Sequence, residues 1–571
     1  MKHLPILIAL SAFIGACQKG PTAWDGPVMS SPRSQLTVDE LLQGKPQPLM
    51  DMSFFARPDW AEDSAAAPFS GILSLAASPL VFPKEKAYYP GEDRFPRISL
   101  SFVASQGQLI PGRKDRMDTR QQSDSYWDVI PGAGRVWREK GDGAWSRASF
   151  PLTLTDRWVG QARNCVATFV YGQDSVSQVC LQCSQETADI DDRQLGNIRA
   201  VLPASFQPMP LPDSAAVVSR HLEEEEGRLP VRPLGEAPGS EALAAYFGQM
   251  GYTSAPTSLG AVMLDSTLFL HPPKTRHGLF PYPEEMRHGL YSVTKSMAGA
   301  LSLFYFAERY GPGLLEEPVS RYVAALAGRG GWEGVTFRHL LDMTTGTAGG
   351  EGAAQLFAPL IAAETAEEAI HNIAALGDAP PLPGQQFNYA STNSFVLSYA
   401  LQRYVESREG EGVHYWELVR EHVLNPIGAP HFTVLHTLEA DASAAIPILA
   451  YGALPTLDEA AKIGLLLANG GQHAGEQLLH RETVLEALDP AAWEGFATGG
   501  DYRGGAYQHS FWSKEVAGQD CRFRVSYMLG FGENYVAFLP GKTLLFRFMD
   551  EHDLNIEELA RRAEGMRSFC P

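Results

Sequence analysis

The sequence predicts an α/β (α+β) domain preceded by a smaller β-rich domain. Two patterns in the chain of 571 residues point to this division. From residue 51 to 205, short strand-like runs alternate with turns and long helical periodicity is absent. From residue 241 to 571, helical runs alternate with strand-like runs such as "SLGAVMLDSTLFL" and "ENYVAFLPGKTLLFRFM". Because a chain of this length exceeds what one hydrophobic core supports, separate domains are expected.

The composition narrows the class of protein. Apolar residues make up 44% and charged residues 20% of the chain, which is typical of globular proteins. The formal net charge is −20, and phosphate binding needs a basic face, so no nucleic-acid partner is expected. The acidic excess is interpreted as a solubilising surface.

The N-terminus has the three-part build of a secretory signal, "MKHLPILIALSAFIGAC". A basic start at Lys2 precedes an apolar run, from residue 4 to 14, that is too short to span a bilayer. The last four residues, 14–17, resemble the bacterial lipobox, which implies removal of the signal peptide 1–17 and lipidation of Cys17. Gln18 follows, which by resemblance to bacterial lipoproteins implies an anchor on the periplasmic face of the outer membrane. The alternatives are a plain signal peptide or a short buried segment with a chance cysteine.

The chain after the signal is expected to begin with a tether. Residues 18–50 are rich in Pro, Ser and Gly, and the β-rich domain of unknown function follows at 51–205. Residues 206–240 shift to Pro, charge and small residues and are interpreted as a linker. The α/β domain then occupies 241–571.

Export permits disulfides, and the cysteines offer two candidate pairs. Cys165 and Cys180 flank an expected hairpin that turns at residues 172–173, which would let them face each other across strands. Cys521 and Cys570 would tie a late strand to the end of the chain. The Cys180-x-x-Cys183 pair has no second CxxC and no HExxH beside it, so no zinc site is expected.

The segment "YSVTKSMAGAL" places a lysine in a helix that is otherwise almost wholly apolar. Ser292 and Lys295 are three residues apart and fall on one helix face. A buried ammonium is costly, so apolar walls and the positive end of the helix dipole should depress the pKa of Lys295. A neutral amine beside a hydroxyl is a base beside a nucleophile. The alternative makes Ser292 an N-cap and Lys295 a side chain that reaches the surface.

Five segments in order resemble the class C β-lactamase-like serine hydrolases, a superfamily that includes DD-peptidases and esterases. "YSVTKSMAGAL" resembles their S-x-T-K motif, and "PLPGQQFNYASTNSFVLSYALQRY" places Tyr389-Ala390-Ser391 on their Y-x-N/Y-x-S motif. The other three segments are "WEGVTFRHLLDMTTGTAGG", "PTLDEAAKIGLLLANGGQHAGEQLL" and "GFGENYVAFLPGKTLLFRF". The resemblance covers residues 240–555. It implies an antiparallel sheet flanked by helices, with an inserted helical region that carries Tyr389.

The resemblance also implies roles for the site residues. Ser292 would attack a carbonyl, Lys295 would take its proton, Tyr389 would relay it to the leaving group, and Ser391 would orient the lysine or substrate. Gly530, Phe531 and Gly532 stand where family members often carry Lys-Thr-Gly or His-x-Gly, and would line the oxyanion site. No metal or organic cofactor is implied.

The third motif differs from that of the family, because it lacks the cationic side chain that binds a substrate carboxylate. Arg522 or Arg524 could substitute for it. The sequence therefore favours an exported serine hydrolase that acts on an ester or amide, with a small-molecule or peptide-like substrate. The alternatives are a β-lactamase or peptidoglycan DD-peptidase, and an inactive binding or scaffold lipoprotein on the same fold. The oligomeric state is not predicted.

Overall fold

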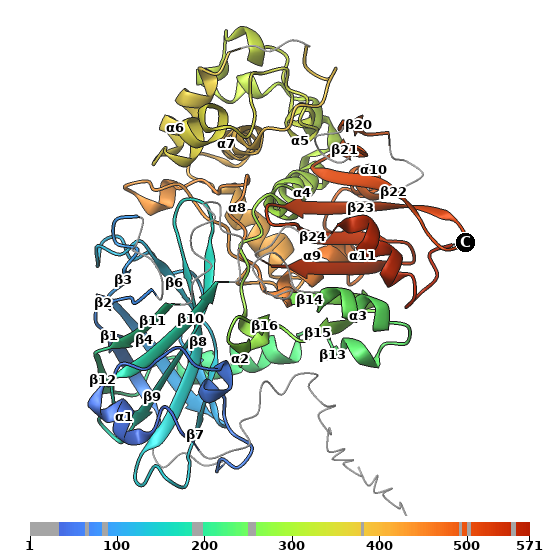
Figure 1. The fold of residues 1–571 in the computed structure, drawn as a ribbon. Helices are drawn as coiled ribbons and strands as arrows, with labels where there is room; N and C mark the ends of the chain where they lie inside the picture. The colour runs from blue at the N-terminus through green and yellow to red at the C-terminus, as the bar shows by residue number, and fades with distance from the viewer. Residues whose placement is uncertain are drawn as a thin grey trace, which may run out of the picture.

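Two large sheets organise the protein (Figure 1). The computed structural model describes residues 33–62, 68–82, 89–185, 198–248, 259–377, 382–489, 494–499, 504–549 and 555–570. The expected signal peptide and Cys17 lie outside these residues. Among the described helices, none combines the length and the apolar character needed to cross a membrane.

The first sheet is antiparallel and forms the β-rich domain. Its strand order is β11-β10-β9-β8-β7-β5-β4-β1-β12, and β6 pairs with β8. The strands are β1 (Ser70–Leu75), β4 (Ile98–Ser105), β5 (Gln108–Pro111), β6 (Asp128–Pro131), β7 (Gly134–Trp137), β8 (Ser146–Thr155), β9 (Ala162–Tyr171), β10 (Val179–Gln185), β11 (Ile198–Leu202) and β12 (Ala204–Pro208). The short strands β2 (Ser78–Pro79) and β3 (Arg94–Phe95) pair separately. Trp127, just before β6, and Phe150 on β8 lie in the core of this domain, where aromatic side chains bury much apolar surface.

The expected tether differs from the structure from residue 33 onward. Helix α1 (Val38–Gln43) begins with a capping box between Thr37 and Glu40 and lies against β9. Leu36 and Leu41 are buried in a cluster with residues of β9. The Pro- and Ser-rich composition obscured these apolar residues, whose burial makes residues 33–50 part of the β-rich domain.

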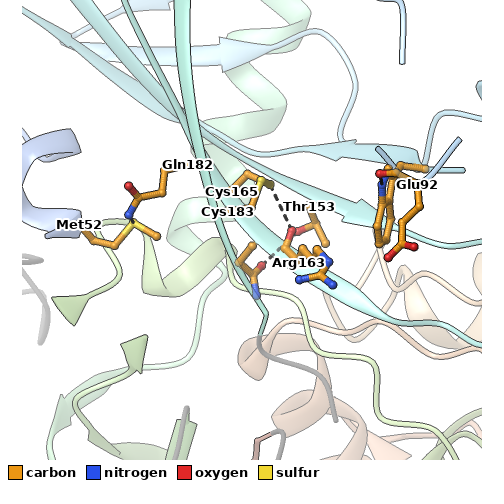
Figure 2. The surroundings of a disulfide bond; sticks show 9 residues. Met52, Glu92, Thr153, Arg163, Cys165, Gln182 and Cys183 are labelled. Atoms are coloured by element: carbon orange, nitrogen blue, oxygen red, sulfur yellow. Dashed lines mark hydrogen bonds between the residues drawn. A yellow bond between two sulfur atoms is a disulfide. The ribbon is translucent and has the colours of Figure 1, made fainter. Parts of the chain in front are cut away.

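The expected pairing of Cys165 with Cys180 is wrong. Cys165 on β9 and Cys183 on β10 lie directly opposite each other and form a disulfide (Figure 2). The amide of Gly172 donates to the carbonyl of Ser175 at 2.9 Å, so the turn is centred later than the sequence suggested. This longer turn shifts the register and places Thr168 opposite Cys180. Cys180 is a buried free thiol, and burial raises its pKa to about 12.

The predicted Cys521–Cys570 disulfide is confirmed. It joins the start of β23 (Arg522–Gly530) to the segment after helix α11 (Ile556–Ala563). The double substitution Cys521→Ser/Cys570→Ser is expected to lower the free energy of unfolding by roughly 2–4 kcal/mol, because the bond closes a loop of 49 residues. Urea unfolding followed by tryptophan fluorescence measures the change. The oxidised wild-type protein is the reference, and an unchanged urea midpoint would contradict the prediction.

The expected linker is instead folded onto both sheets. Helix α2 (Ser214–Glu226) contacts β4 and β5, and β13 (Val231–Pro233) pairs in parallel with β15 (Thr267–His271). Glu224 of α2 is 3.0 Å from His431 Nε2, and Asp115 of the β-rich domain is 3.2 Å from its Nδ1. Although burial opposes a charge on His431, these carboxylates raise its pKa to about 9. The imidazolium therefore connects the two domains.

The second sheet has the order β13-β15-β14-β25-β24-β23-β22-β21-β20, and every pair except β13–β15 is antiparallel. Its other strands are β14 (Leu259–Leu264), β20 (Phe496–Ala497), β21 (Ala506–Gln508), β22 (Phe511–Ala517), β24 (Asn534–Leu539) and β25 (Thr543–Phe548). Alternate residues along these strands enter two separate cores, as period-two side chains require. The expected mixed α+β fold is confirmed.

Helices cover both faces of this sheet (Figure 1). Helices α3 (Glu241–Phe247) and α11 lie in one core, and α4 (Leu301–Tyr310) and α9 (Leu457–Ala468) in the other. Between α4 and α9 the chain forms a mainly helical region. Its helices are α5 (Phe337–Leu341), α6 (Ala366–Ala374), α7 (Ser391–Glu409) and α8 (Tyr415–Val419), and α10 (Arg481–Leu488) follows α9.

Candidate active site

Ser292 lies in a tight turn that leads into α4. Tyr291, just before it, is held at a φ of +46°, an uncommon conformation for a bulky residue. The turn is bonded to a second segment, since the amide of Leu290 donates to the carbonyl of Ala453 at 3.1 Å. A π-helical stretch, Lys295–Ala300, connects the turn to α4. Wide helical turns of this kind often occur at functional sites.

Lys295 lies on the same face as Ser292, and only 1% of its surface is exposed. Its Nζ is 2.8 Å from Ser292 Oγ, 2.9 Å from Ser391 Oγ and 2.8 Å from the carbonyl oxygen of Ala450. An ammonium has three donors, and these three acceptors use all of them. The lysine is therefore fixed in position rather than extended toward solvent.

Burial lowers the pKa of Lys295 to about 8, and the negative charge of Glu351 opposes this shift. A pKa near neutrality is what a general base needs, because a useful fraction of the amine is then neutral at working pH. The lowered pKa has the direction that the sequence analysis predicts for Lys295.

Ser391 connects Lys295 to a carboxylate that the sequence did not single out. Ser391 begins helix α7, where unbonded backbone N–H groups attract an anion. Glu351 Oε1 accepts from the Ser391 amide at 2.6 Å, and Glu351 Oε2 accepts from Ser391 Oγ at 2.9 Å. Glu351 is an exposed residue of the loop between α5 and α6, so it reaches the site from a separate segment of the chain.

Tyr389 lies beside the lysine. The Nζ of Lys295 is 5.1 Å from the centroid of its ring, within the range of a cation–π contact. The ring packs against Trp512, with centroids 5.5 Å apart, and against Tyr507. These contacts hold the phenol ring beside Lys295, which bonds to Ser292 and Ser391.

Strand β23 ends against the turn that carries Ser292. A Cβ placed on Gly530 would lie 2.0 Å from the carbonyl oxygen of Leu290 and 3.4 Å from the amide nitrogen of Ser292. The absence of a side chain is thus what allows the strand to approach this turn. Phe531 is 43% exposed and its ring meets that of Tyr291 edge-on at 5.6 Å. Gly532 turns the chain with a φ of +78°.

Substituting Gly530 by alanine is expected to reduce hydrolysis at least about tenfold and to destabilise the fold by roughly 1–3 kcal/mol, because the new methyl group must displace the turn at Leu290. Steady-state kinetics and thermal melting measure the two effects. Gly313→Ala is the matched control, since a Cβ there meets nothing within 4 Å. Equal activity in the two variants would contradict the prediction.

The two arginines that could have replaced the missing cation lie far from the turn at Gly530. Arg522 pairs with Glu515, and Arg524 Nη1 lies 3.0 Å from Ser513 Oγ. At about 3.3 Å per residue along β23, Arg524 is about 20 Å from Gly530 and Arg522 is farther. Arg547 lies near the turn but is fully buried, and it donates to the carbonyl of Gly532.

The β-rich domain contacts the two segments that precede and support the site. The side-chain amide of Asn164 on β9 exchanges two hydrogen bonds with the backbone of Arg287, five residues before Ser292. Gly160 approaches Tyr451 so closely that an added Cβ would lie 3.2 Å from its carbonyl oxygen. Asp156 fixes this loop by accepting backbone N–H groups, including that of Gly160 at 3.3 Å. The neighbour of Tyr451 is Ala450, whose carbonyl accepts from Lys295.

Two members of the constellation were missed by sequence reasoning. The carbonyl of Ala450 leaves no trace in the sequence, because any residue supplies one. Glu351 offered a weak signal, as a lone acidic residue within the glycine-rich run "TAGGEGA". No group of three or more His, Cys, Asp or Glu side chains within the described ranges has a metal-binding arrangement.

Comparisons with known proteins show what this region is similar to. Residues 269–512 match the family model described as Beta-lactamase. A search of curated proteins found no match. Among similar solved structures is a penicillin-binding protein homologue from Caulobacter crescentus, with 14% identity and a TM-score of 0.43 over 57% of this chain and 97% of that chain. A family VIII carboxylesterase has 15% identity and a TM-score of 0.42 over 57% of this chain and 95% of its own. A class C beta-lactamase has 14% identity and a TM-score of 0.41 over 58% of this chain and 95% of its own. Within this chain, residues 269–512 are therefore similar to the beta-lactamase family.

Proposed function

We propose that this chain is an exported serine hydrolase that forms an acyl-enzyme on Ser292 and acts on uncharged esters or amides. One observation carries the proposal: Lys295 Nζ lies 2.8 Å from Ser292 Oγ in a buried site that lowers the lysine pKa to about 8. A neutral amine at hydrogen-bond distance from a hydroxyl is the arrangement that activates a serine nucleophile.

In the proposed mechanism, the Ser292 Oγ–H bond breaks as its proton moves to Lys295 Nζ and Oγ bonds to the substrate carbonyl carbon. The negative charge that develops on the carbonyl oxygen is stabilised by the Ser292 amide and the backbone at the end of β23, near Gly530. The proton then passes by way of the Tyr389 phenol to the leaving alcohol or amine. Water releases the acyl group in a second cycle of the same steps.

The preference for an uncharged substrate follows from the charges around the site. The third-motif turn reads Gly530-Phe531-Gly532 and has no basic side chain, and Glu351 adds a carboxylate close to Ser391. A substrate carboxylate would meet this negative charge without a cation to bind it. Phe531, exposed beside Tyr291, offers an apolar surface next to the nucleophile.

The proposal is tested by labelling the purified protein with a fluorophosphonate and locating the adduct by peptide mass spectrometry. We expect one phosphonate on Ser292. A protein that stays unlabelled between pH 7 and 9 would be an inactive member of the family, in agreement with a binding or scaffold role.

A second candidate function, β-lactam or D-alanyl peptide hydrolysis, is favoured by the family match. A short-chain p-nitrophenyl ester and a chromogenic cephalosporin, compared on one enzyme preparation, discriminate between the two. We expect kcat/KM to be higher for the ester. A higher value for the cephalosporin would favour the β-lactamase alternative.

The location is also a proposal. The lipobox-like sequence before Cys17 supports a lipid anchor at the periplasmic face of the outer membrane, and two disulfides suit an oxidising compartment. Metabolic labelling with an alkyne fatty acid tests the anchor. We expect Cys17→Ala to remove the label, and a wild-type protein that takes up no label would contradict the anchor.

A further inference from the structure

We propose that Glu351 is a positioning residue that fixes the hydroxyl proton of Ser391, so that Lys295 can accept a proton only from Ser292. The inference rests on the proposed function. It concerns the direction of the hydrogen bonds that connect Glu351 to Ser391, Ser391 to Lys295 and Lys295 to Ser292.

The direction of the first bond is fixed by chemistry. A carboxylate only accepts hydrogen bonds, and both Glu351 oxygens face Ser391, one on its amide and one on its Oγ. The hydroxyl proton of Ser391 therefore points to Glu351. The oxygen of that hydroxyl can then only accept from Lys295 Nζ, 2.9 Å away.

The remaining bonds follow for the neutral lysine. Its amine has two N–H groups and one lone pair. The Ala450 carbonyl can only accept, at 2.8 Å, and Ser391 Oγ is restricted to accepting, so these two take both N–H groups. The lone pair is left facing the third neighbour, Ser292 Oγ at 2.8 Å. After the proton moves, the ammonium donates to all three neighbours and no group has to turn.

Among the described residues, Glu351 is the charged group that acts on the pKa of Lys295, and its effect is second to that of burial. The ring of Tyr389 covers one side of the lysine. Tyr451 and Tyr507 also lie within electrostatic range of Glu351, and burial raises the pKa of both far above neutrality, so they stay uncharged in the working range. Glu351 is thus the group whose removal should alter the behaviour of the lysine.

The substitution Glu351→Gln nearly preserves the shape of the side chain but reverses the hydrogen bonds from residue 351 to Ser391 Oγ and from Ser391 Oγ to Lys295. The Ser391 amide can only donate, so it takes the oxygen of the new side chain and leaves the NH₂ group facing Ser391 Oγ. That NH₂ donates to Oγ, and the freed hydroxyl proton turns to the lone pair of Lys295. The lysine can then no longer accept from Ser292. Loss of the negative charge also lowers the pKa of Lys295 further.

The test is the rate of fluorophosphonate labelling of Ser292 between pH 6 and 10 in full-length wild type, Glu351→Gln, Glu351→Asp and the control Glu333→Gln, which removes a charge from an exposed residue elsewhere. We expect Glu351→Gln to label about 10²-fold more slowly, with the midpoint of its pH profile displaced to lower pH. Glu351→Asp keeps an acceptor-only carboxylate and should restore the wild-type midpoint. Glu333→Gln should match the wild type.

Each other outcome is decisive. A slower rate with an unmoved midpoint would mean that Glu351 only caps helix α7, and an unchanged rate would mean that it has no part in the chemistry. Either result overturns the inference while leaving Ser292 as the nucleophile. A wild-type protein that does not label at any pH overturns the proposed function and this inference together.

Discussion

Substitution of Ser292 by alanine is expected to lower kcat for a p-nitrophenyl ester at least about 10⁴-fold, because it removes the hydroxyl that forms the acyl-enzyme in the proposed mechanism. KM should change little, since the hydroxyl contributes mainly to bond making. The variant should remain folded, because Lys295 keeps Ser391 Oγ and the Ala450 carbonyl as acceptors. Circular dichroism and thermal melting check that the fold is retained.

Ser302→Ala is the matched control for this prediction. Ser302 is a buried serine of α4 whose hydroxyl donates to the carbonyl of Ala298 at 2.7 Å, away from the nucleophile. Its loss should leave kcat within about twofold, because an intrahelical hydrogen bond of this kind contributes only about 1 kcal/mol to stability. Activity of Ser292→Ala within tenfold of the wild type would refute the assignment of Ser292.

Lys295→Met is expected to lower the acylation rate about 10³-fold and to remove its pH dependence. In the wild type, burial favours the neutral amine and lowers the lysine pKa from its ordinary 10.5 to about 8. The neutral amine is the base, so kcat/KM should rise with pH and level off above about 8. At pH 7 only about one-tenth of the lysine is neutral, and the rate should fall tenfold for each further unit of acid.

The pH profile of a neutral ester, which does not itself titrate, measures this effect. Lys462→Met serves as the control, because Lys462 is a buried lysine of α9 that donates to the carbonyl of Gly428 and pairs with Asp458. Its profile should keep the wild-type midpoint. A wild-type profile that is flat from pH 6 to 9, or a Lys295→Met variant that still shows the rise, would count against the lysine as base.

The part of the site that could be predicted from the sequence is the part that depends on short spacing. Ser292 and Lys295 are one helical turn apart, so a local pattern was enough to place them together. Ser391 came from an ordered set of motifs, and it does accept a hydrogen bond from Lys295. The alternation of helical and strand-like runs likewise predicted the mixed fold, because it reflects which residues face a core.

What could not be predicted depends on how distant segments approach each other. Glu351 reaches Ser391 across 40 positions of sequence, and nothing local in a glycine-rich loop specifies that approach. The cysteine pairing failed for a related reason. Strand register depends on the length of the turn, and the extra turn residues moved Cys183, rather than Cys180, opposite Cys165.

The contact between Gly160 and Tyr451 has a consequence for truncation of this protein. The carbonyl of Ala450 accepts from Lys295, and the next residue, Tyr451, packs against Gly160 of the β-rich domain. The loop that contains Gly160 is fixed by hydrogen bonds to Asp156. A truncated protein that starts at residue 241 would lack the Gly160 loop, so Leu435 and the backbone of Tyr451 would be exposed to water. Lys295 would then be held less rigidly. The α/β domain and the β-rich domain should therefore be kept together in tests of the proposed activity.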